Sequence, residues 1–435
     1  MQETTFTPSQ QVALTKCVKW FNDPKKHQVF RIYGAAGTGK SFIVGEIVKR
    51  LGLKDDEVAF AAPTGKAATV LMKRFKFSNI STLCSLIYSP HTKDKLIVND
   101  KNEIEGIDST TSFIAKHKID DFRLIVLDEV SMVDSYAMED LLSHGIPVIA
   151  IGDPYQLPPI NDRPIDESGA DALLTEIVRQ EAGNPIIALS DKIRKGGKLQ
   201  YCDIDGIVTV LPYAAFNQQE LLTLMKSVDQ VICGLNVTRR MLNKMMRRAL
   251  GYVGKYPVIG DKLICKSNEK RIFVDYNINL CNGMICRCVK EGKKVGDFLM
   301  KVGVKPDISK FKYDLISDAG IFFTNDFAYD QHWSAYMMRD GSYVPKKKIL
   351  EEMKKYDKAL YNSLVAEDNA LKATSLGIAA ITRFDYAYAI SCHASQGSEF
   401  DSVLVIDESK TFRSNASRWL YTAITRAKKR LIILS

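Results

Sequence analysis

The chain has 435 residues, more than one hydrophobic core organises, so we expect at least two domains. Hydrophobic residues make up 46% of it, which supplies ample apolar surface to bury and excludes a disordered chain. Lys and Arg (60) outnumber Asp and Glu (51), and the net charge of +9 is compatible with a polyanionic partner without requiring one.

The nine cysteines are scattered and form no Cys-x-x-Cys pair. This pattern is typical of free thiols in a reducing compartment, rather than of zinc sites or disulfides. No apolar run approaches the roughly 18 residues that a membrane span needs, and the first residues do not resemble a signal peptide. The sequence therefore predicts a cytoplasmic protein with no membrane partner.

The first third of the chain alternates short apolar strands with helices. We predict strands at 29–33, 58–62, 124–127 and 148–151. A helix is predicted over 41–51, because its apolar residues recur at the spacing of one helix face. This alternation is typical of a parallel sheet, in which the segments that follow the strands converge at one edge.

The alternation resumes near residue 230 and indicates a second α/β domain. Strands are predicted at 231–233, 386–390, 403–406 and 431–434. The predicted fold class is therefore α/β, with two parallel-sheet domains.

Two stretches interrupt the α/β pattern and are interpreted as insertions. Residues 87–120 contain Lys95–Val98, with three consecutive apolar residues, followed by the turn-rich Asn99–Asn102, which predicts a β-hairpin. Residues 266–375 combine short β-like segments with a helix over 347–366.

A phosphate-binding loop is the clearest motif. Gly34–Ser41 matches G-x-x-x-x-G-K-[ST] between a predicted strand and a predicted helix. The glycines allow backbone N–H groups to surround phosphate, Lys40 is expected to reach the β- and γ-phosphates, and the Ser41 hydroxyl is expected to bind Mg²⁺. The alternative, a Gly-rich turn without a ligand, is disfavoured by the strand–loop–helix context. The predicted loop contacts to nucleotide are Gly34, Ala35, Ala36, Gly37, Thr38, Gly39, Lys40 and Ser41.

Two further segments follow strands and supply candidate catalytic groups. Asp128 fits the carboxylate on the Mg²⁺ side of a phosphoryl-transfer site, and Glu129 fits the group that activates the attacking water. Gln156, in Gly152–Pro159, could contact the γ-phosphate or that water. Taken alone, the acids could be a solvated strand end and the Gln156 segment a Pro-rich turn.

Two arginines are candidates for stabilising charge in the transition state. Arg179 lies in Leu-Thr-Glu-Ile-Val-Arg-Gln, and Arg426 lies in Tyr-Thr-Ala-Ile-Thr-Arg-Ala. Taken alone, each sequence context favours a surface arginine.

Together the motifs resemble those of superfamily 1 helicases of the RecD-like and Dda-like branch, from about Thr7 to the C-terminus. The overall resemblance is greatest to compact phage Dda-type helicases, which implies the host cytoplasm if a phage encodes the chain. Cys84 and Ala394 depart from the histidine and lysine that the family often has. The segments that carry the resemblance, in order, are Thr7–Gln10, Gly34–Ser41, Ala62–Ala68, Asp128–Met132, Gly152–Pro159, Arg179–Gln180, Asn236 with Arg239, His393–Glu399 and Tyr421–Ala427.

The resemblance implies two RecA-like domains that bind ATP and Mg²⁺ between them. Around the nucleotide it implies Lys40, Ser41, Asp128, Glu129, Gln156, Arg179 and Arg426, with Gln10, Gly397 and Glu399 as further nucleotide contacts. For DNA it implies Pro63, Thr64, Lys66, Asn236, Arg239, His393, Ser395 and Gln396.

The expected domain ranges follow from the motifs. They are 1–86 with 121–185 for the first RecA-like domain, 87–120 for a hairpin that is the candidate wedge, 186–265 with 376–435 for the second RecA-like domain, and 266–375 for an insertion of SH3-like β segments plus a helix.

The expected activity is ATP-dependent unwinding of DNA by a monomer that moves 5′ to 3′ along single-stranded DNA, the polarity coming from the resemblance alone. Partners would be single-stranded DNA, junctions with duplex, and single-strand-binding or replisome proteins; replication, recombination and repair are all open. One alternative is a translocase that remodels forks or strips proteins. A P-loop kinase would have no use for the Ser395–Gly397 segment, and a non-catalytic scaffold would not need Lys40 and Glu129.

Overall fold

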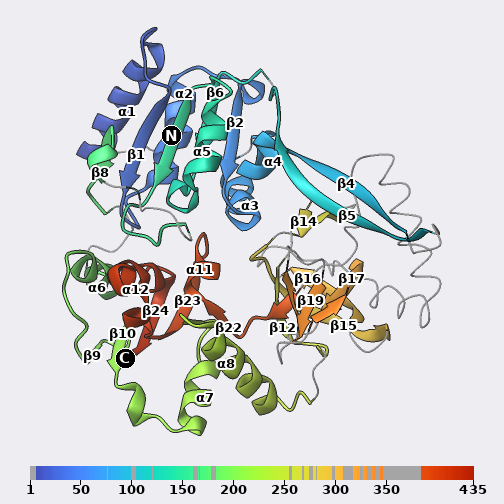
Figure 1. The fold of residues 1–435 in the computed structure, drawn as a ribbon. Coiled ribbons are helices and arrows are strands. Elements are labelled where there is room, and N and C mark those ends of the chain that lie inside the picture. Colours follow the sequence, from blue (N-terminus) through green and yellow to red (C-terminus); the bar gives the residue numbers. More distant parts are fainter. Residues whose placement is uncertain are drawn as a thin grey trace. The chain divides into compact units, whose positions relative to one another are not determined.

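The computed structural model describes most of the chain, as two compact units (Figure 1). The first unit comprises Met1–Ile87, Lys116–Met246 and Ala389–Ser435, and the second comprises Tyr88–Ala115 and Arg247–Tyr388. The described residues are 6–75, 77–98, 104–119, 121–159, 165, 167–177, 183–253, 257–266, 269–273, 278–280, 282–295, 299–306, 317–323, 327–330, 335–338, 343–345 and 384–435. The predicted helix over 347–366 and Arg179 lie outside them. Among the described residues, none of the helices is both long and apolar enough to span a bilayer.

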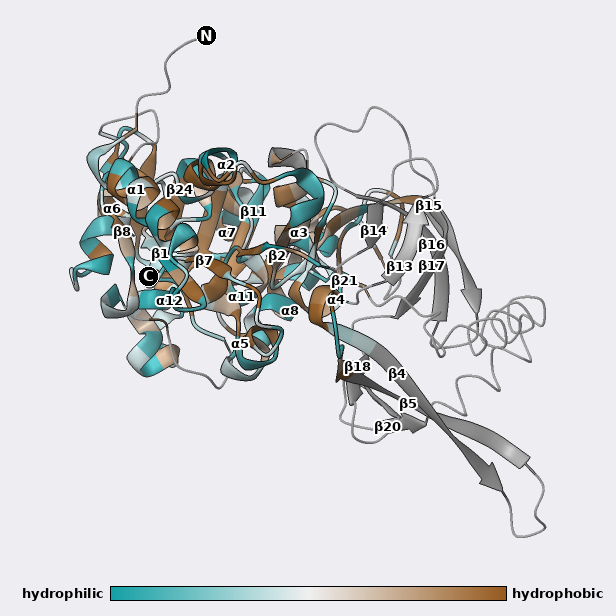
Figure 2. Cartoon of the chain, turned by 90° about the horizontal axis from the view of Figure 1, so that it is seen from above, coloured by the Kyte–Doolittle hydropathy of each residue, from teal (hydrophilic) through white to brown (hydrophobic). Residues whose placement is uncertain are grey.

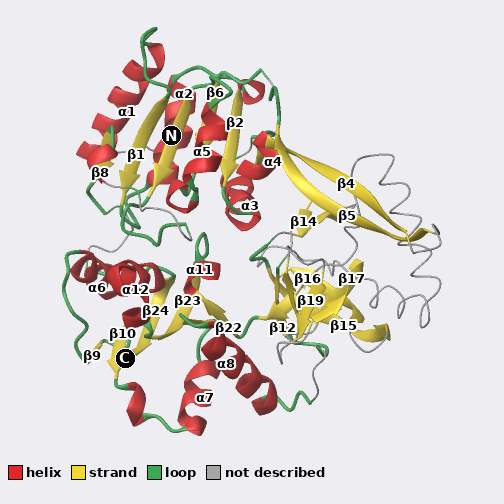
Figure 3. Cartoon of the chain, viewed as in Figure 1, coloured by secondary structure: helices red, strands yellow, loops and turns green. Residues whose placement is uncertain are grey.

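The first unit contains two six-stranded sheets with helices around them (Figure 3). The first sheet has the order β3-β2-β6-β7-β1-β8, and all its neighbouring strands are parallel. Its strands are β1 (Val29–Gly34), β2 (Val58–Ala62), β3 (Ile80–Thr82), β6 (Leu124–Leu127), β7 (Val148–Gly152) and β8 (Ala172–Leu174). The four predicted strands are confirmed, with β1 and β7 each one residue longer. The carboxyl ends of all six strands therefore lie at one edge.

The helices of this half begin where the sequence supplies caps. The Thr7 side chain accepts from the backbone N–H of Gln10, and the Gln10 side chain accepts from the backbone N–H of Thr7, so both cap the first helix. Thr64 caps α3 by accepting from the N–H of Ala67. The helices are α1 (Pro8–Asn22), α2 (Lys40–Arg50), α3 (Gly65–Arg74), α4 (Leu83–Ile87) and α5 (Ser135–Leu142), with short 3₁₀ turns at Asp55–Glu57, Val130–Met132 and Glu167–Gly169.

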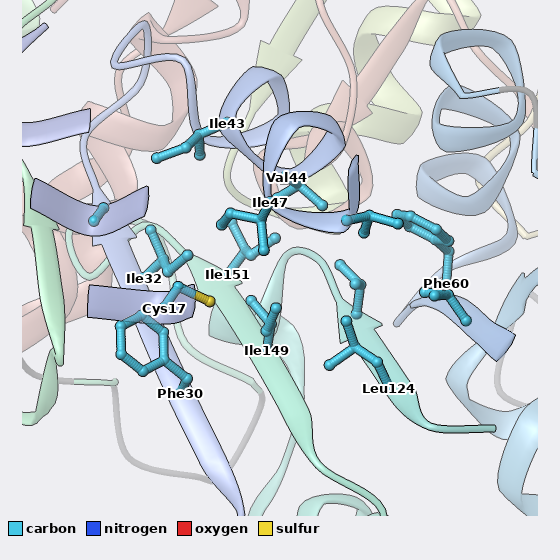
Figure 4. Packing of buried hydrophobic residues seen from close by; sticks show 14 of the residues in the cluster. Cys17, Phe30, Ile32, Ile43, Val44, Ile47, Phe60, Leu124, Ile149 and Ile151 are labelled. Carbon is cyan, nitrogen blue, oxygen red and sulfur yellow. The ribbon is translucent and has the colours of Figure 1, made fainter. Parts of the chain in front are cut away.

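One face of the first sheet packs against α1, α2 and α3 (Figure 4). Alternate strand residues point to this face, as Phe30 with Ile32 and Ile149 with Ile151 show. The residues on the other face of the strands are buried as well, which explains why the strands read as continuous apolar runs. In Figure 2 the helices carry both hydrophilic and hydrophobic colour, as expected of elements with one face toward a sheet. This rigid layer fixes the edge at which the functional segments emerge.

The second sheet has the order β22-β11-β23-β24-β10-β9. Its neighbours are parallel except for β9 and β10. Its strands are β9 (Cys202–Ile204), β10 (Val208–Leu211), β11 (Gln230–Cys233), β22 (Ala389–Ser391), β23 (Phe400–Ile406) and β24 (Ala427–Leu434). The helices around it are α6 (Pro185–Arg194), α7 (Gln218–Lys226), α8 (Asn236–Ala249), α11 (Cys392–Ser395) and α12 (Ala416–Ile424), with 3₁₀ turns at Tyr213–Ala215 and Ser409–Asn415. The α/β fold with parallel sheets is thus as predicted.

The predicted strand at 386–390 is wrong as a single element. The chain forms β21 (Phe384–Tyr386), which pairs with β12 (Lys262–Cys265) in the second unit, and then β22 in the parallel sheet. The break is held by the N–H of Ala387 donating to the carbonyl of Lys262, and by the Tyr388 hydroxyl donating to Asp261. A continuous apolar run carries no sign of the residue at which it changes sheets.

The second unit is built from antiparallel pairs. Its five-stranded sheet has the order β17-β16-β15-β12-β21. The other strands of this sheet are β15 (Ile285–Val295), β16 (Leu299–Pro306) and β17 (Ser317–Phe323), and smaller sheets pair β13 (Glu269–Phe273) with β14 (Ile278–Leu280) and join β18 (Phe327–Asp330), β19 (Ala335–Met338) and β20 (Tyr343–Pro345). The hairpin consists of β4 (Tyr88–Val98) and β5 (Ile104–Ala115) and is longer than the apolar run at its tip indicated.

Candidate active site

The loop between β1 and α2 is shaped by its glycines. Gly37 and Gly39 have φ of 82° and 79°, a conformation that side chains with a Cβ rarely adopt. A Cβ on Gly34 would lie 2.6 Å from Thr38 Oγ1 and 3.0 Å from Leu174 Cβ, so any side chain there would force the loop to move. The loop leads into the N-terminus of α2, and such a turn of backbone N–H groups is an anion-binding arrangement.

Lys40 lies over this loop. Its Nζ donates to the carbonyl oxygens of Gly34 (2.7 Å) and Ala35 (2.9 Å), and it is 4.0 Å from Asp153 Oδ2. A phosphate offers charged acceptors, which are stronger partners for an ammonium than neutral carbonyls. Ser41 is the second residue of α2, and its side chain is outside what the structure describes.

Asp128 and Glu129 follow β6 at the same edge of the sheet. Glu129 has φ 52° and ψ 41°, a left-handed conformation that is uncommon for a residue with a side chain. Its backbone N–H donates to Asp128 Oδ1 at 2.9 Å. Within the described part of the chain, Glu129 Oε2 is buried without a hydrogen-bond partner. A buried acceptor of this kind is suited to a proton-bearing ligand such as water.

Burial and, to a smaller extent, the neighbouring Asp128 raise the pKa of Glu129 to about 7. Arg426 and Lys40 act in the opposite direction, because both are positive. The carboxyl group therefore exchanges its proton near neutral pH, which is the range in which a general base works best.

We predict that ATP hydrolysis loses rate below neutral pH if Glu129 is the base. The ionised carboxylate is the active form, so kcat/KM should fall about tenfold per pH unit below the Glu129 pKa of about 7 and level off above it. The measurement is DNA-stimulated ATP turnover from pH 5.5 to 8, at DNA concentrations shown by a parallel binding assay to be saturating throughout. A rate that stays flat across this range would argue against Glu129 as the base.

The segment after β7 adds two buried polar residues. Asp153 is 0% exposed and accepts from the Tyr421 hydroxyl (2.8 Å) and from Gln156 Nε2 (3.4 Å). Burial raises the pKa of Asp153, while Lys40 and these hydrogen bonds favour the carboxylate. Gln156 is 4% exposed, and among the described residues nothing donates to its Oε1. Both Gln156 Oε1 and Glu129 Oε2 are thus buried acceptors at one sheet edge.

Arg426 comes from the second sheet, just after α12. It is 4% exposed and held in place by three hydrogen bonds, from Nε to Thr422 O (2.9 Å), from Nη1 to Ser398 O (3.0 Å) and from Nη2 to Thr425 Oγ1 (3.0 Å). Its charge is close enough to lower the pKa of Glu129. Thr422 in turn accepts from the backbone N–H of Leu157, so this arginine is linked through Thr422 to the segment that follows β7 of the first sheet.

Further hydrogen bonds connect the segment after β7 with α11 and α12. The N–H of Leu157 donates to Thr422 Oγ1 (3.0 Å), and Gln396 Nε2 donates to the carbonyl of Leu157 (3.0 Å). Arg418 also donates to the carbonyl of Pro154. Groups that follow strands of both sheets are therefore joined next to the phosphate loop.

The remaining predicted nucleotide contacts lie around this loop. Gln10 is 1% exposed, and its Nε2 donates to Thr38 O at 3.0 Å while its Oε1 accepts from Thr7 N at 3.1 Å. Gly397 has φ 67°, and Glu399 Oε2 lies 3.8 Å from Lys428 Nζ. Direct contacts of Gln10, Gly397 and Glu399 with nucleotide stay predictions.

The predicted DNA-contacting residues divide by accessibility. Thr64 and Lys66 are half-buried at the start of α3, next to the half-buried Pro63, with Lys66 Nζ 5.5 Å from the ring centre of Phe400. Ser395 is 0% exposed and donates to Cys392 O, and Gln396 is 5% exposed. The Ser395 and Gln396 side chains are therefore committed to contacts inside the protein.

Asn236, Arg239 and His393 lie at the corresponding edge of the second sheet. Asn236 is exposed and accepts from Arg239 Nε at 3.2 Å, while Arg239 is 9% exposed. Burial lowers the pKa of the half-buried His393, whose ring lies 5.8 Å from that of Phe412. Of the predicted set, Asn236 is the most accessible at this edge.

Sequence reasoning assigned no role to Asp153 and Tyr421, which the structure places beside the phosphate loop. Both stand inside segments that had already been singled out. Asp153 is an acid directly after a strand of the first sheet, as Asp128 is, and this shared position could have identified it. No feature of the sequence near Tyr421 indicates that its side chain reaches the phosphate loop.

Comparison with known proteins agrees with this geometry. Residues 7–209 match the AAA domain family, and residues 386–434 match the UvrD-like helicase C-terminal domain family. The first match covers most of the first sheet, with the phosphate loop and the acidic edge. The second covers β22, β23, α12 and Arg426.

Among curated proteins, the RecBCD enzyme subunit RecD of Buchnera aphidicola is 23% identical over 94% of this chain and 70% of its own length. The ATP-dependent RecD2 DNA helicase of Deinococcus radiodurans is 30% identical over 39% of this chain and 22% of its own length. The solved structure of a Bacteroides Pif1 bound to single-stranded DNA aligns with 100% of this chain and 93% of that chain, at 16% identity and a TM-score of 0.48. The chain is therefore similar in sequence to RecD and RecD2, and the two family matches together cover its phosphate loop, its acidic edge and Arg426.

Proposed function

We propose that the chain is an ATP-dependent DNA helicase that moves 5′ to 3′ along single-stranded DNA and belongs beside the Dda-type helicases. The observation that carries this proposal is the position of Arg426. It follows a helix of the second sheet, yet its Nε donates to the carbonyl of Thr422, whose Oγ1 accepts from the N–H of Leu157 after β7 of the first sheet. A site completed by groups from both sheets can respond to the state of its nucleotide, and the RecD2 relative is named as an ATP-dependent DNA helicase.

In the proposed reaction, ATP binds with its phosphates at the Gly34–Ser41 loop. Lys40 exchanges its carbonyl partners for phosphate oxygens, and Glu129 accepts a proton from the attacking water through its unpartnered Oε2. Gln156 Oε1 is a second acceptor that can orient that water. Arg426 offsets the negative charge that develops as the phosphoryl group transfers.

The residues present also fit a magnesium ion. Mg²⁺ prefers oxygen ligands and keeps several waters, so one carboxylate and one hydroxyl suffice beside the phosphates. Asp128 and Ser41 would hold it, and it would neutralise charge on the phosphates when bound.

The two sheet domains would move relative to each other if the hydrogen bonds of Leu157 with Thr422 and Gln396 depend on the bound nucleotide. Loss of the γ-phosphate would remove a shared binding partner of Arg426 and Gln156. The hydrogen bonds of Leu157 with Thr422 and Gln396 would then break. If each sheet domain grips DNA in turn, one cycle shifts the strand. Grip through Thr64, Lys66 and Asn236 would be tolerant of sequence and weakened by salt.

The function is tested with duplexes that carry a single-stranded tail on one side only. We expect ATP-dependent strand separation of the substrate with a 5′ tail and little separation of the one with a 3′ tail. Unwinding from the 3′ tail alone would overturn the polarity, and DNA-stimulated ATP hydrolysis with neither substrate unwound would favour a translocase. A chain without ATP hydrolysis in the presence of DNA would contradict the motor itself.

We further propose that the β4–β5 hairpin separates the strands of the duplex. Its two strands pair from Tyr88 with Ala115 to Val98 with Ile104, so the hairpin is long. In the sequence it is inserted between α4 and β6. Removing residues 95–107, closed by a two-residue turn, should abolish unwinding of a forked duplex while DNA-stimulated ATP turnover is retained. Unwinding at the original rate would show that the hairpin is not the wedge.

A further inference from the structure

The Tyr421 hydroxyl connects the phosphate loop with the segment after β7. It accepts from the backbone N–H of Ala36 at 2.9 Å and donates to Asp153 Oδ2 at 2.8 Å. The side chain is 1% exposed, and its ring lies edge-on to Tyr155 with ring centres 5.9 Å apart. A single hydroxyl thus uses both its acceptor and its donor capacity at the nucleotide site.

The partner of this hydroxyl on the loop is one of the groups expected to bind phosphate. Ala36 is the third residue of the Gly34–Ser41 loop, whose backbone N–H groups surround phosphate in this class of turn. An N–H that donates to Tyr421 cannot give the same well-aligned bond to a phosphate oxygen. The Lys40 ammonium is held in a comparable way by loop carbonyls.

The donor side of the hydroxyl is fixed by Asp153. Burial and the adjacent carboxylate hold the pKa of Tyr421 well above its usual range, so the hydroxyl keeps its proton. Asp153 Oδ2 also accepts from Gln156 Nε2 and lies 4.0 Å from Lys40 Nζ. Tyr421 and two groups expected to act on the nucleotide, Gln156 and Lys40, therefore lie around one carboxylate oxygen.

We propose that Tyr421 is a positioning residue whose hydroxyl holds the Ala36 N–H and has to be displaced by the phosphates of the nucleotide. This inference rests on the proposed function and adds a regulatory step to it. Tyr421 lies on α12, five residues before Arg426. Its displacement therefore releases α12 from the loop in the same event that offers phosphate charge to Arg426.

The test compares Tyr421→Phe with the wild-type chain by titrating ADP with Mg²⁺ in a calorimeter. A hydroxyl that competes with phosphate lowers affinity by about the worth of one hydrogen bond, so Tyr421→Phe should bind ADP about three- to tenfold more tightly. The KM for ATP should fall to a similar extent while kcat does not rise. Unchanged or weaker ADP binding by Tyr421→Phe would overturn the proposal.

Tyr388→Phe is the matched control. It removes another buried tyrosine hydroxyl that donates to a carboxylate, Asp261 Oδ1 at 2.9 Å, within the second unit. It should leave ADP affinity unchanged, and tighter binding in both variants would show a general effect of lost tyrosine hydroxyls and overturn the proposal. A wild-type chain that binds no ADP would instead contradict the proposed function itself.

A second measurement does not depend on removing the hydroxyl. With 3-fluorotyrosine placed at position 421, the ¹⁹F resonance should shift when ADP and Mg²⁺ are added, because the hydroxyl loses the Ala36 N–H. The same label at the exposed Tyr201 should give no shift. A resonance at position 421 that stays unchanged at saturating ADP would overturn the displacement step, even if Tyr421→Phe failed to fold.

Discussion

Replacing Lys40 by alanine should reduce DNA-stimulated ATP turnover by at least about 100-fold, the scale of losing one well-placed donor at a developing charge. Affinity for single-stranded DNA should be unchanged, because the Lys40 ammonium faces the loop carbonyls and Asp153. The loss has a second source. Lys40 lowers the pKa of Glu129, so its removal also leaves less of that carboxylate ionised at neutral pH. ATP turnover at saturating DNA measures the loss of rate, and a separate DNA-binding titration measures the affinity for single-stranded DNA.

Lys49→Ala is the matched control for this experiment. Lys49 is an exposed lysine in the last turn of the same helix, α2, and its loss should change neither turnover nor DNA affinity. Retained DNA-stimulated hydrolysis in Lys40→Ala would place the nucleotide elsewhere. Loss of DNA binding in Lys40→Ala, with Lys49→Ala normal, would mean that the loop also supports the DNA-binding surface.

Local features of the fold could be predicted from the sequence because their causes are local. Strands buried on both faces read as apolar runs, and the loop at Gly34–Ser41 needs glycine where φ is positive, as at Gly37 and Gly39. The edge at which Asp128 and Asp153 emerge follows from parallel pairing. Each of these needs only a few neighbouring residues and one general rule of sheet geometry.

Features that depend on distant pairing could not be predicted in the same way. Tyr421 meets Ala36 across 385 positions of sequence, and only the folded chain shows that its hydroxyl faces the loop. The buried side chain of Ser395 donates to Cys392 O, a contact that no local pattern indicated, and its contact with DNA stays a prediction. The change of sheet between β21 and β22 also lacks a local sequence signal, because the segment Tyr386–Ile390 contains only apolar and aromatic residues. An apolar sequence pattern predicts which residues are buried, but it does not predict which distant residue each of them contacts.

The second large effect is expected for Arg426→Ala, which should lower ATP turnover by about 10³-fold, the lower end of what such an arginine contributes. Affinity for ATP should change little, since Lys40 and the loop N–H groups remain. Arg426→Lys should recover only part of the rate. A lysine keeps the charge, but it cannot donate at once to Thr422 O, Ser398 O and Thr425 Oγ1 as the planar guanidinium does.

Destabilisation of the fold would also lower the ATP turnover of Arg426→Ala, because Arg426 is buried and makes three hydrogen bonds. Thermal unfolding and DNA binding of each variant separate the two causes, with Arg430→Ala, at a half-buried arginine farther along β24, as the matched control. An Arg426→Ala protein that folds, binds DNA and hydrolyses ATP at nearly the wild-type rate would remove Arg426 from the transition state.

The pH dependence of the residual activity gives the sharpest evidence on Arg426. The guanidinium lowers the pKa of Glu129, so Arg426→Ala should move the acid limb of the rate profile to higher pH. Arg426→Lys should move it back toward the wild-type position, since the charge is restored. A loss of packing alone shifts the rate at every pH equally and leaves the limb in place. A moved limb would therefore show that a group from the second sheet acts electrostatically on the base supplied by the first, which is what a motor driven by ATP requires.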